Sequence, residues 1–185
     1  MGLGTIASQV SPEIALSALS SRAVGSATEA RRGADPVTPS GGAESKTLAQ
    51  AKPAQGNTLG SLLTLTNAER TKAKLGNLRL NTKLAAAAQR QADDMARSGQ
   101  FSHTGSDGSQ MGDRVKSSGY RFSLAAENIY MQSPSNRAER AIAGWMNSKG
   151  HRENLLNGQF TEIGLGYASR GNQHYYVQVF GKPRS

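Results

Sequence analysis

Residues 141–157, AIAGWMNSKGHRENLLN, decide the fold of this chain and contain one of its three histidines. Ala138, Ile142 and Trp145 recur at the spacing of one helix face, and a Ser-Lys-Gly run then interrupts the pattern just before His151. The pattern predicts an apolar stripe that presents His151 at a helix junction. From this stretch alone two roles remain open. The imidazole either caps or packs a helix end, or it belongs to a functional site.

Composition divides the chain into two parts. Residues 1–57 are rich in Ala, Gly, Ser, Pro and Thr, contain no aromatic residue and show no sustained periodicity, which predicts a disordered leader or linker. Residues 58–185 contain the periodic segments and are numerous enough to bury one hydrophobic core. We therefore expect a single folded domain over residues 58–185, preceded by a disordered N-terminal leader.

The chain is strongly basic and has no cysteine. Its 22 basic and 13 acidic side chains give a net charge of +9, and about +8 of this charge lies in residues 61–185. Such a charge favours anionic partners, such as membrane surfaces, cell-wall polymers and nucleic acid. Few aromatic residues accompany the basic ones, which argues against a nucleic-acid groove. Without cysteine, disulfides and thiolate chemistry are excluded, so packing alone must stabilise the fold.

The N-terminal residues contain no convincing export signal. The apolar run at residues 14–19 is short, is interrupted by Ser17 and follows Glu13 instead of a basic segment. No segment of the sequence reaches the length needed to cross a bilayer. An unconventional leader, a misassigned start and retention in the cytoplasm all remain open from the sequence.

Helical and strand patterns alternate in the folded part. Asn81 and Gly99 predict the start and end of a helix through Ser98, with Leu84 and Met95 on one face. The other expected elements are a first helix ending near Gly76, a third helix over residues 110–118 that Ser109 could cap, a strand around residues 128–131, a helix capped by Ser135, and strands over residues 160–168 and 174–180 joined by a loop over residues 169–173. The last run is apolar on both alternations, so both faces of the sheet should be covered. This order predicts an α+β fold, a three-layer α-β-α sandwich with a small central antiparallel sheet.

Two further motifs contain candidate site residues. In FSHTGSDG, residues 101–108, glycine and aspartate predict a turn that places His103 in a loop directly after a helix. In AAENIYM, residues 125–131, Glu127 lies among apolar neighbours and needs a buried partner or a shifted pKa. The alternatives are a plain surface role for His103 and a bond from Glu127 to backbone amides. His174 is expected to be a strand residue outside any site.

Four motifs, namely FSHTGSDG, AAENIYM, AIAGWMNSKGHRENLLN and FTEIGLGYA with HYYVQVFG, resemble in order and spacing the CAP superfamily, also called SCP/PR1-like, in its short cysteine-free bacterial form. The match runs from about residue 62 to residue 181. The resemblance implies an α-β-α sandwich with a cleft in which two histidines and two glutamates face one another. On this chain the implied cleft contains His103, Glu127, Ser148 and His151, and Ser148 replaces the second glutamate.

The resemblance further implies that His103 and His151 could bind a divalent metal, as the histidines of several family members do. Two imidazoles suit Zn and related metals and would leave coordination positions open for water. Glu127 could fix a histidine tautomer or act as a catalytic base toward metal-bound water. Because Ser148 supplies no carboxylate, we expect weak or condition-dependent metal binding. Glu153 lies two residues beyond His151, but the motif does not place it in the cleft.

The resemblance also sets the expected function. CAP members are secreted defence, venom, reproductive and cell-envelope proteins, and some bind sterols or fatty acids. We expect an extracellular or periplasmic protein whose cleft binds a divalent metal, a small lipid or a cell-envelope ligand, without efficient catalysis. The alternatives are a metal-dependent hydrolase of peptides, esters or peptidoglycan using His103, His151 and Glu127, a serine hydrolase using Ser148 and His151, and a purely structural interaction domain. The absence of HExxH and GxSxG motifs argues against both hydrolases.

Overall fold

A computed structural model of the chain describes residues 53–184, so the prediction of a disordered leader falls mostly outside the described residues. In chain order the elements are α1 (Pro53–Lys72), β1 (Arg79–Leu80), α2 (Thr82–Ser98), α3 (Met111–Ser117), β2 (Phe122–Gln132), α4 (Ala138–Asn147), α5 (Lys149–Leu155), β3 (Glu162–Arg170) and β4 (Gln173–Pro183). The first helix begins at Pro53, ahead of the domain boundary predicted at residue 58.

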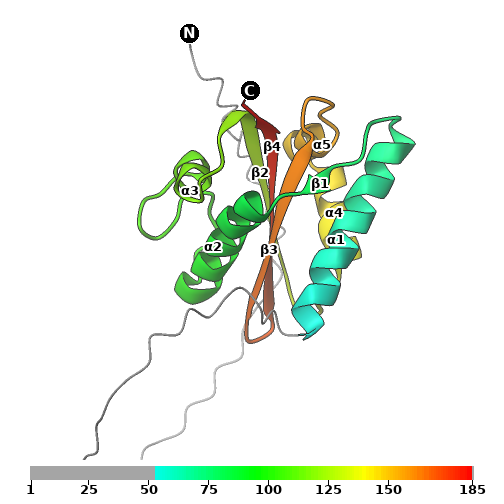
Figure 1. The fold of residues 1–185 in the computed structure, drawn as a ribbon. Coiled ribbons are helices and arrows are strands. Elements are labelled where there is room, and N and C mark those ends of the chain that lie inside the picture. The colour runs from blue at the N-terminus through cyan, green and yellow to red at the C-terminus, as the bar shows by residue number, and fades with distance from the viewer. Residues whose placement is uncertain (1–52, 185) are drawn as a thin grey trace, which may run out of the picture. The chain divides into compact units, whose positions relative to one another are not determined.

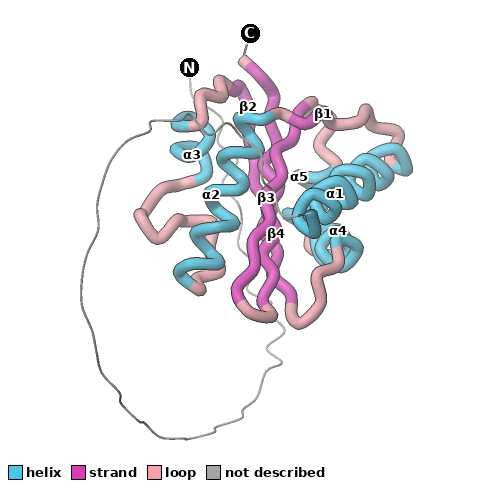
Figure 2. Tube along the Cα trace, turned by 60° about the horizontal axis from the view of Figure 1, so that its bottom comes forward, coloured by secondary structure: helices cyan, strands magenta, loops and turns pink. Residues whose placement is uncertain are grey.

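The sheet forms the middle layer, with the strand order β1-β3-β4-β2. Strand β4 pairs antiparallel with β2 and with β3, whereas the two-residue strand β1 pairs parallel with β3. Figures 1 and 2 show α2 and α3 on one face of the sheet and α1, α4 and α5 on the other. The three-layer α+β sandwich is therefore confirmed. The short parallel edge strand is an addition that the sequence did not predict.

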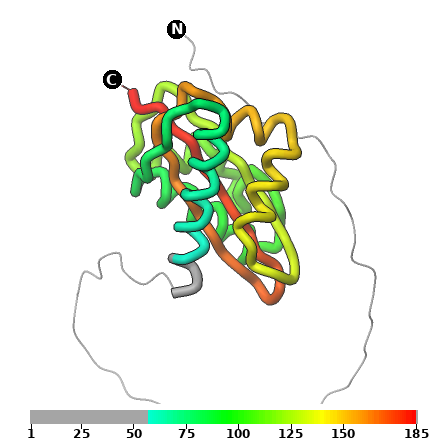
Figure 3. The backbone as a smooth tube through the Cα atoms, turned by 90° about the vertical axis from the view of Figure 1, so that its right-hand side faces the viewer, coloured from blue at the N-terminus to red at the C-terminus, as the bar shows by residue number. Residues whose placement is uncertain are grey.

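Each face of the sheet has its own hydrophobic core. On β4, Tyr175, Val177 and Val179 pack toward α2 and α3, and Tyr176 and Phe180 pack toward the opposite helices. All five are fully buried, which confirms the predicted two-sided burial of this run. Figure 3 views the second face directly, where α1 and α4 lie in contact over the sheet. Trp145 of α4 is buried at the centre of that layer and donates from its indole N–H to the carbonyl of Ile129 over 3.0 Å.

Helix α2 begins and ends where the sequence predicts. The Asn81 side chain accepts from the backbone N–H groups of Lys83 and Leu84, at 3.0 and 3.2 Å. Gly99 ends the helix in the left-handed conformation, with φ of 75°, which glycine adopts without steric cost. Both signals act within a few residues along the chain, which explains why the sequence alone sufficed.

Two glycines of β3 allow α2 to lie directly against the sheet. A Cβ at Gly164 would come within 2.0 Å of the Leu84 carbonyl carbon, and a Cβ at Gly166 within 2.4 Å of the Ala88 carbonyl oxygen. These neighbours are helix backbone, which cannot rotate away as a side chain can. The spacing between α2 and β3 therefore requires glycine at both positions.

The strands are longer than predicted. Strand β2 runs from Phe122 to Gln132, so Glu127 lies in its middle and not at its entrance. The loop predicted over residues 169–173 shrinks to Gly171 and Asn172, because Gly171 adopts a φ of 56° and supports a two-residue hairpin turn.

Two predicted helix caps are wrong. Helix α4 begins at Ala138, because Asn136 is tied to Tyr176 and Thr58 by side-chain bonds of 2.6 and 2.9 Å that keep Ser135 in the preceding loop. Helix α3 is preceded by Gln110, whose backbone N–H donates to Asp113 over 3.1 Å, so Ser109 is not its cap. The histidine junction also forms a separate short helix, α5, that the sequence did not predict.

Candidate functional site

The loop that carries His103 follows α2 and is fastened to it by polar contacts. Gln91 donates from Nε2 to the Ser102 carbonyl over 2.5 Å. Ser106 donates to the Asp94 carboxylate from its backbone N–H, at 2.7 Å, and from its hydroxyl, at 2.6 Å. The loop is therefore held to α2 on both sides of His103, which lies directly after a helix as expected.

The turn after His103 depends on its glycines and on Asp107. A Cβ at Gly105 would come within 2.7 Å of both Asp107 and Ser109, and Gly108 has a φ of 82°. Asp107 accepts from the Ser109 backbone N–H at 2.9 Å and pairs with Arg90 of α2 at 2.8 Å. The bonds from Ser109, followed by the contact with Arg90, hold the pKa of Asp107 well below its ordinary range.

Glu127 lies on the edge strand β2, and its side chain contacts His103. Its carboxylate oxygen Oε1 lies 2.9 Å from Nδ1 of His103, and the Glu127 side chain is 2 % exposed. In the neutral imidazole, a proton on Nδ1 donates to this carboxylate and leaves the lone pair on Nε2. This contact fits the first of the two roles that the sequence left open for Glu127, that of fixing the tautomer of His103.

Arg114 of α3 is a partner of Glu127 that the sequence did not predict. Its nitrogen Nη2 lies 3.0 and 2.9 Å from the two carboxylate oxygens of Glu127 and also donates to the His103 carbonyl over 3.0 Å. Nη1 donates to the Ser109 carbonyl over 2.8 Å. The side chain is 1 % exposed, so this ion pair is buried. A buried carboxylate needs a partner, but sequence spacing alone does not distinguish Arg114 from its neighbour Lys116.

His151 lies on α5, on the other side of the same strand. Burial lowers the pKa of its imidazole, and the nearby charge of His103 lowers that pKa further. Asn128, the neighbour of Glu127 on β2, donates to the His151 carbonyl over 3.0 Å, so His151 lies beside the part of the strand that carries Glu127. We call His103, Arg114, Glu127 and His151 the histidine site.

A histidine with a lowered pKa takes up its proton less readily in the folded protein than in the unfolded chain. The stability that neutral His151 contributes is therefore complete above about pH 6.5 and falls as the pH drops from there toward the folded-state pKa. In an NMR titration with chelator present, we expect His151 to titrate below about pH 6.5. The His103→Gln substitution should raise that pKa without fully restoring it, because burial remains. Titration of His151 at or above the unfolded value would contradict this environment.

A buried polar chain fixes the backbone around His151. Asn128 of β2 donates to the His151 carbonyl over 3.0 Å and accepts from Asn154 over 3.0 Å. It also donates to Gln178 of β4 over 3.3 Å, and Gln178 donates to Thr66 of α1 over 2.7 Å. The chain thus links α5 to α1 through two strands. Since such groups are costly to leave unpaired, their mutual bonds fix the position of α5.

Arg70 connects the end of α5 to α1. Its guanidinium donates to the carbonyls of Leu155 and Asn157, each over 2.9 Å, and to those of Gly76 and Phe160, over 2.9 and 3.2 Å. The residue is 1 % exposed, and burial lowers its pKa. The C-terminal carbonyls of a helix carry partial negative charge, which favours a cation at this position.

Ser148 and Glu153 supply no second carboxylate to the site. Ser148 lies at the junction of α4 and α5, where its backbone N–H donates to the Trp145 carbonyl over 3.2 Å. The Glu153 side chain is 64 % exposed and lies 4.0 Å from Lys149. Within residues 53–184 no hydrogen bond joins the Ser148 hydroxyl to His151, so the geometry gives no support to a serine nucleophile.

The residues available for a metal are few. In the described part of the chain, no three His, Asp or Glu side chains are grouped so that they could bind a metal ion. His103 and His151 offer two imidazoles, while the carboxylate of Glu127 already pairs with Arg114. The two imidazoles are therefore the candidate metal ligands of this site.

A cavity of about 530 Å³ lies behind the His103 loop. Side chains of α2, including Arg90, Gln91 and Asp94, form one wall, and Arg114 contributes to another. His103 and His151 do not line it. Most of the residues that line it are polar or charged.

His174 has a structural role, as expected. It lies on β4, where Nδ1 is 2.7 Å from the Tyr167 hydroxyl and Nε2 is 3.2 Å from the Pro134 carbonyl oxygen. Its ring also stacks on Tyr167, with centroids 6.0 Å apart. It therefore offers a matched control for substitutions of the other two histidines.

A family model described as "Cysteine-rich secretory protein family" (CAP) matches residues 63–180. Among curated proteins, the chain is 38 % identical over 108 residues to the uncharacterized protein YkwD of Bacillus subtilis (strain 168), covering 58 % of this chain and 41 % of YkwD. It is 35 % identical over 124 residues to the uncharacterized membrane protein YlbC of the same strain, covering 65 % of this chain and 33 % of YlbC. The chain thus spans less than half the length of these relatives.

Solved structures share the fold. An extracellular protein containing an SCP domain from Bacillus anthracis str. Ames matches with a TM-score of 0.64 and 31 % identity, over 73 % of this chain and 45 % of that protein. A cysteine-rich secretory protein (SAV1118) from Staphylococcus aureus subsp. aureus Mu50 matches with a TM-score of 0.56 and 28 % identity, over 68 % of this chain and 38 % of that protein.

Proposed function

Because the chain belongs to the CAP family and contains a cysteine-free CAP domain of the bacterial type, we propose that it is an exported binding domain and not an efficient enzyme. Its ligand, a divalent metal or a small cell-envelope molecule, contacts the histidine site through His103 and His151. The proposal rests on the geometry of the site together with the family, since the domain spans less than half of its curated relatives.

The single observation that carries the proposal is that both carboxylate oxygens of Glu127 already have hydrogen-bonding partners. Both carboxylate oxygens lie within 3.0 Å of Arg114, and Oε1 also contacts His103. A general base needs an oxygen within reach of the water it deprotonates, and the Glu127 side chain is 2 % exposed. Glu127 therefore acts in this proposal as a positioning residue that orients His103 for binding.

Titration with Zn tests the metal part of the proposal. Two imidazoles without a free carboxylate would leave the other coordination positions of the metal to water. We therefore expect a Kd no tighter than about 1 µM by isothermal titration calorimetry. His103→Ala and His151→Ala should each abolish the measurable heat, because one imidazole is a poor site by itself. His174→Ala, which removes a histidine outside the site, should leave the Kd unchanged. Tight Zn binding that survives His103→Ala would contradict the proposed ligands.

The metal-dependent hydrolase remains the second candidate, because His103, a candidate metal ligand, is in direct contact with the Glu127 carboxylate. It predicts turnover of a peptide, ester or peptidoglycan substrate in the presence of Zn, and loss of that turnover in Glu127→Gln. Such a result would replace the binding proposal with a catalytic one.

Export is part of the proposal because a solved relative is described as extracellular and the matched family is described as secretory. Within residues 53–184, no helix has both the length and the apolar character required to cross a membrane. Cell fractionation with N-terminal sequencing of the mature protein tests export. Recovery of the protein in the cytoplasm alone would contradict it.

A further inference from the structure

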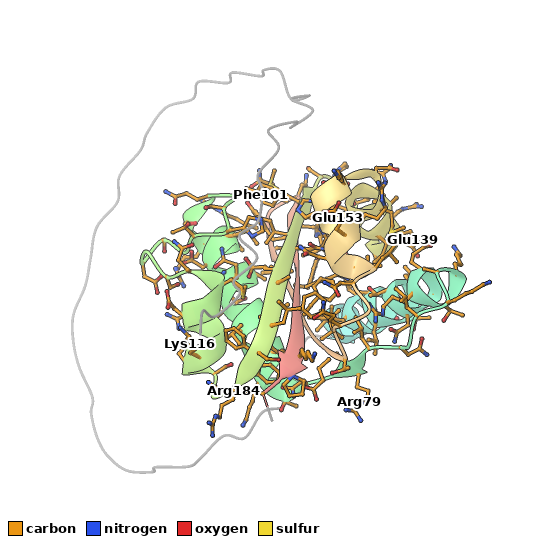
Figure 4. The ribbon with its side chains drawn as sticks, turned by 90° about the horizontal axis from the view of Figure 1, so that it is seen from above. Arg79, Phe101, Lys116, Glu139, Glu153 and Arg184 are labelled. Atoms are coloured by element: carbon orange, nitrogen blue, oxygen red, sulfur yellow. The ribbon has the colours of Figure 1, made fainter. Side chains whose placement is uncertain are left out.

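Six basic side chains gather at one end of the central sheet. They come from β1, the start of α2, the end of α3 and the adjoining ends of β2 and β4, and all six are exposed. We call this set the basic end, and it consists of Arg79, Lys83, Lys116, Arg121, Lys182 and Arg184. In Figure 4, Arg79, Lys116 and Arg184 lie along one side of the view, and Phe101, Glu139 and Glu153 lie along the other.

The strand register brings these segments together. Arg79 pairs with Glu162 of β3, which in turn pairs with Gly181 of β4. The backbone N–H of Arg184 donates to the Arg121 carbonyl over 3.0 Å. A shallow cavity of about 330 Å³ is lined by Lys83 and Arg121 together with Tyr120, Glu162 and Pro183. The cations therefore share one surface and are not merely scattered along the sequence.

Little negative charge opposes them there. Within the segments 79–83, 116–123, 159–162 and 181–184, Glu162 is the only side-chain carboxylate. Glu162 accepts from the Tyr120 hydroxyl over 2.5 Å, and burial followed by this bond raises the pKa of Tyr120. Elsewhere on the described domain, some exposed cations do have acidic partners, such as Arg90 with Asp107.

One large apolar side chain stands among the cations. Leu80, between Arg79 and the start of α2, is 57 % exposed. The aromatic residues of this end, Tyr120 and Phe122, pack against the core and offer no exposed ring for base stacking. Stacking on exposed rings is what single-stranded nucleic acid requires, whereas cations around an apolar residue suit a lipid headgroup layer.

We propose that the basic end is a docking surface for an anionic lipid bilayer, with its cations on the headgroup phosphates and Leu80 entering the interface. Clusters of four to eight Lys or Arg bind anionic membranes in this way. Phe101 and Glu153 lie two residues from His103 and His151, and Figure 4 places both away from the basic end. Docking therefore leaves open the side on which Phe101 and Glu153 lie, close in sequence to His103 and His151. The inference is independent of any ligand at that site.

Vesicle co-sedimentation of the full chain tests this surface, with chelator present and at about 0.1 M salt, where charges still act over about 10 Å. The protein should sediment with phosphatidylcholine vesicles containing about one-third phosphatidylglycerol and not with phosphatidylcholine alone. Each basic residue contributes about fivefold to partitioning, so Arg79→Gln, Arg121→Gln and Arg184→Gln combined should weaken it about 100-fold. Raising the salt tenfold should release the wild-type protein.

The matched control combines Arg137→Gln, Arg140→Gln and Arg170→Gln, which removes the same charge from exposed positions outside the basic end. This control should weaken partitioning no more than about threefold. An equal loss in both triple variants, or no binding of the wild type to anionic vesicles, would overturn the proposal. Leu80→Ser should weaken vesicle binding about fivefold without changing binding to soluble polyphosphate. If Leu80→Ser and the wild type bound vesicles with equal affinity, the bilayer proposal would be wrong, and the partner of the basic end would be a soluble polyanion.

Discussion

Gly164→Ala is expected to lower the free energy of unfolding by at least about 3 kcal/mol, which is the upper end of the usual cost of overpacking a core. The added methyl group would come within 2.0 to 2.3 Å of three backbone atoms of Leu84 and Ala85 in α2. Relief requires the whole helix to move off β3, which opens the core that Leu84 and Ala88 share with β4. Urea unfolding followed by circular dichroism measures the change.

Gly60→Ala provides the control, because Gly60 lies in α1 with no atom within 4 Å of the position where a Cβ would stand. The same substitution should there raise stability by about 0.5–1 kcal/mol, since alanine favours the helix over glycine. The two substitutions are therefore expected to change stability in opposite directions. If Gly164→Ala cost less than about 1 kcal/mol, α2 could not pack against β3 as closely as described.

Arg114→Met is expected to cost about 3–5 kcal/mol, because it leaves the carboxylate of Glu127 buried without a countercharge. His103 remains within 2.9 Å of that carboxylate but cannot replace a permanent cation. The Arg114→Met/Glu127→Leu double variant should be more stable than Arg114→Met alone, since it removes the unpaired charge as well as its partner. Thermal or urea unfolding of the wild type, Arg114→Met, Glu127→Leu and the double variant forms a double-mutant cycle that measures the coupling.

Lys116→Met, two positions along the same helix and exposed, should change stability by no more than about 0.5 kcal/mol. A double variant that is no more stable than Arg114→Met would show that Arg114 contributes through packing and not through its charge. NMR of the His103 ring provides a second readout. Loss of Arg114 should shift its resonances, because Nη2 bonds the His103 carbonyl as well as Glu127.

The features that the sequence predicted well are encoded locally. The caps of α2 at Asn81 and Gly99 act within one helical turn, and the two-sided burial of β4 follows from the alternation of Tyr175 to Phe180. Strand β1 could not be predicted, because two exposed residues have no periodicity of their own and pair only once β3 is in place.

The histidine site was predictable in part, because three of its residues lie in short sequence motifs. His103, Glu127 and His151 stand in motifs that resemble a known family, and the structure places His103 and Glu127 in direct contact. Arg114 belongs to no such motif, and only the tertiary fold brings α3 onto β2. This partner changes the expected chemistry more than the missing carboxylate at Ser148, because it engages the one carboxylate that remains.

The contacts of Arg70 also bear on how the chain folds during synthesis. Its carbonyl acceptors at Leu155 and Phe160 follow it by 85 and 90 residues. At about 5–20 residues per second, the ribosome adds them roughly 4 to 18 seconds after Arg70. Until then the guanidinium must remain hydrated, because a buried cation without acceptors is costly. Helix α1 is therefore made first and docks late, and a nascent chain stalled before residue 155 should keep α1 accessible to protease.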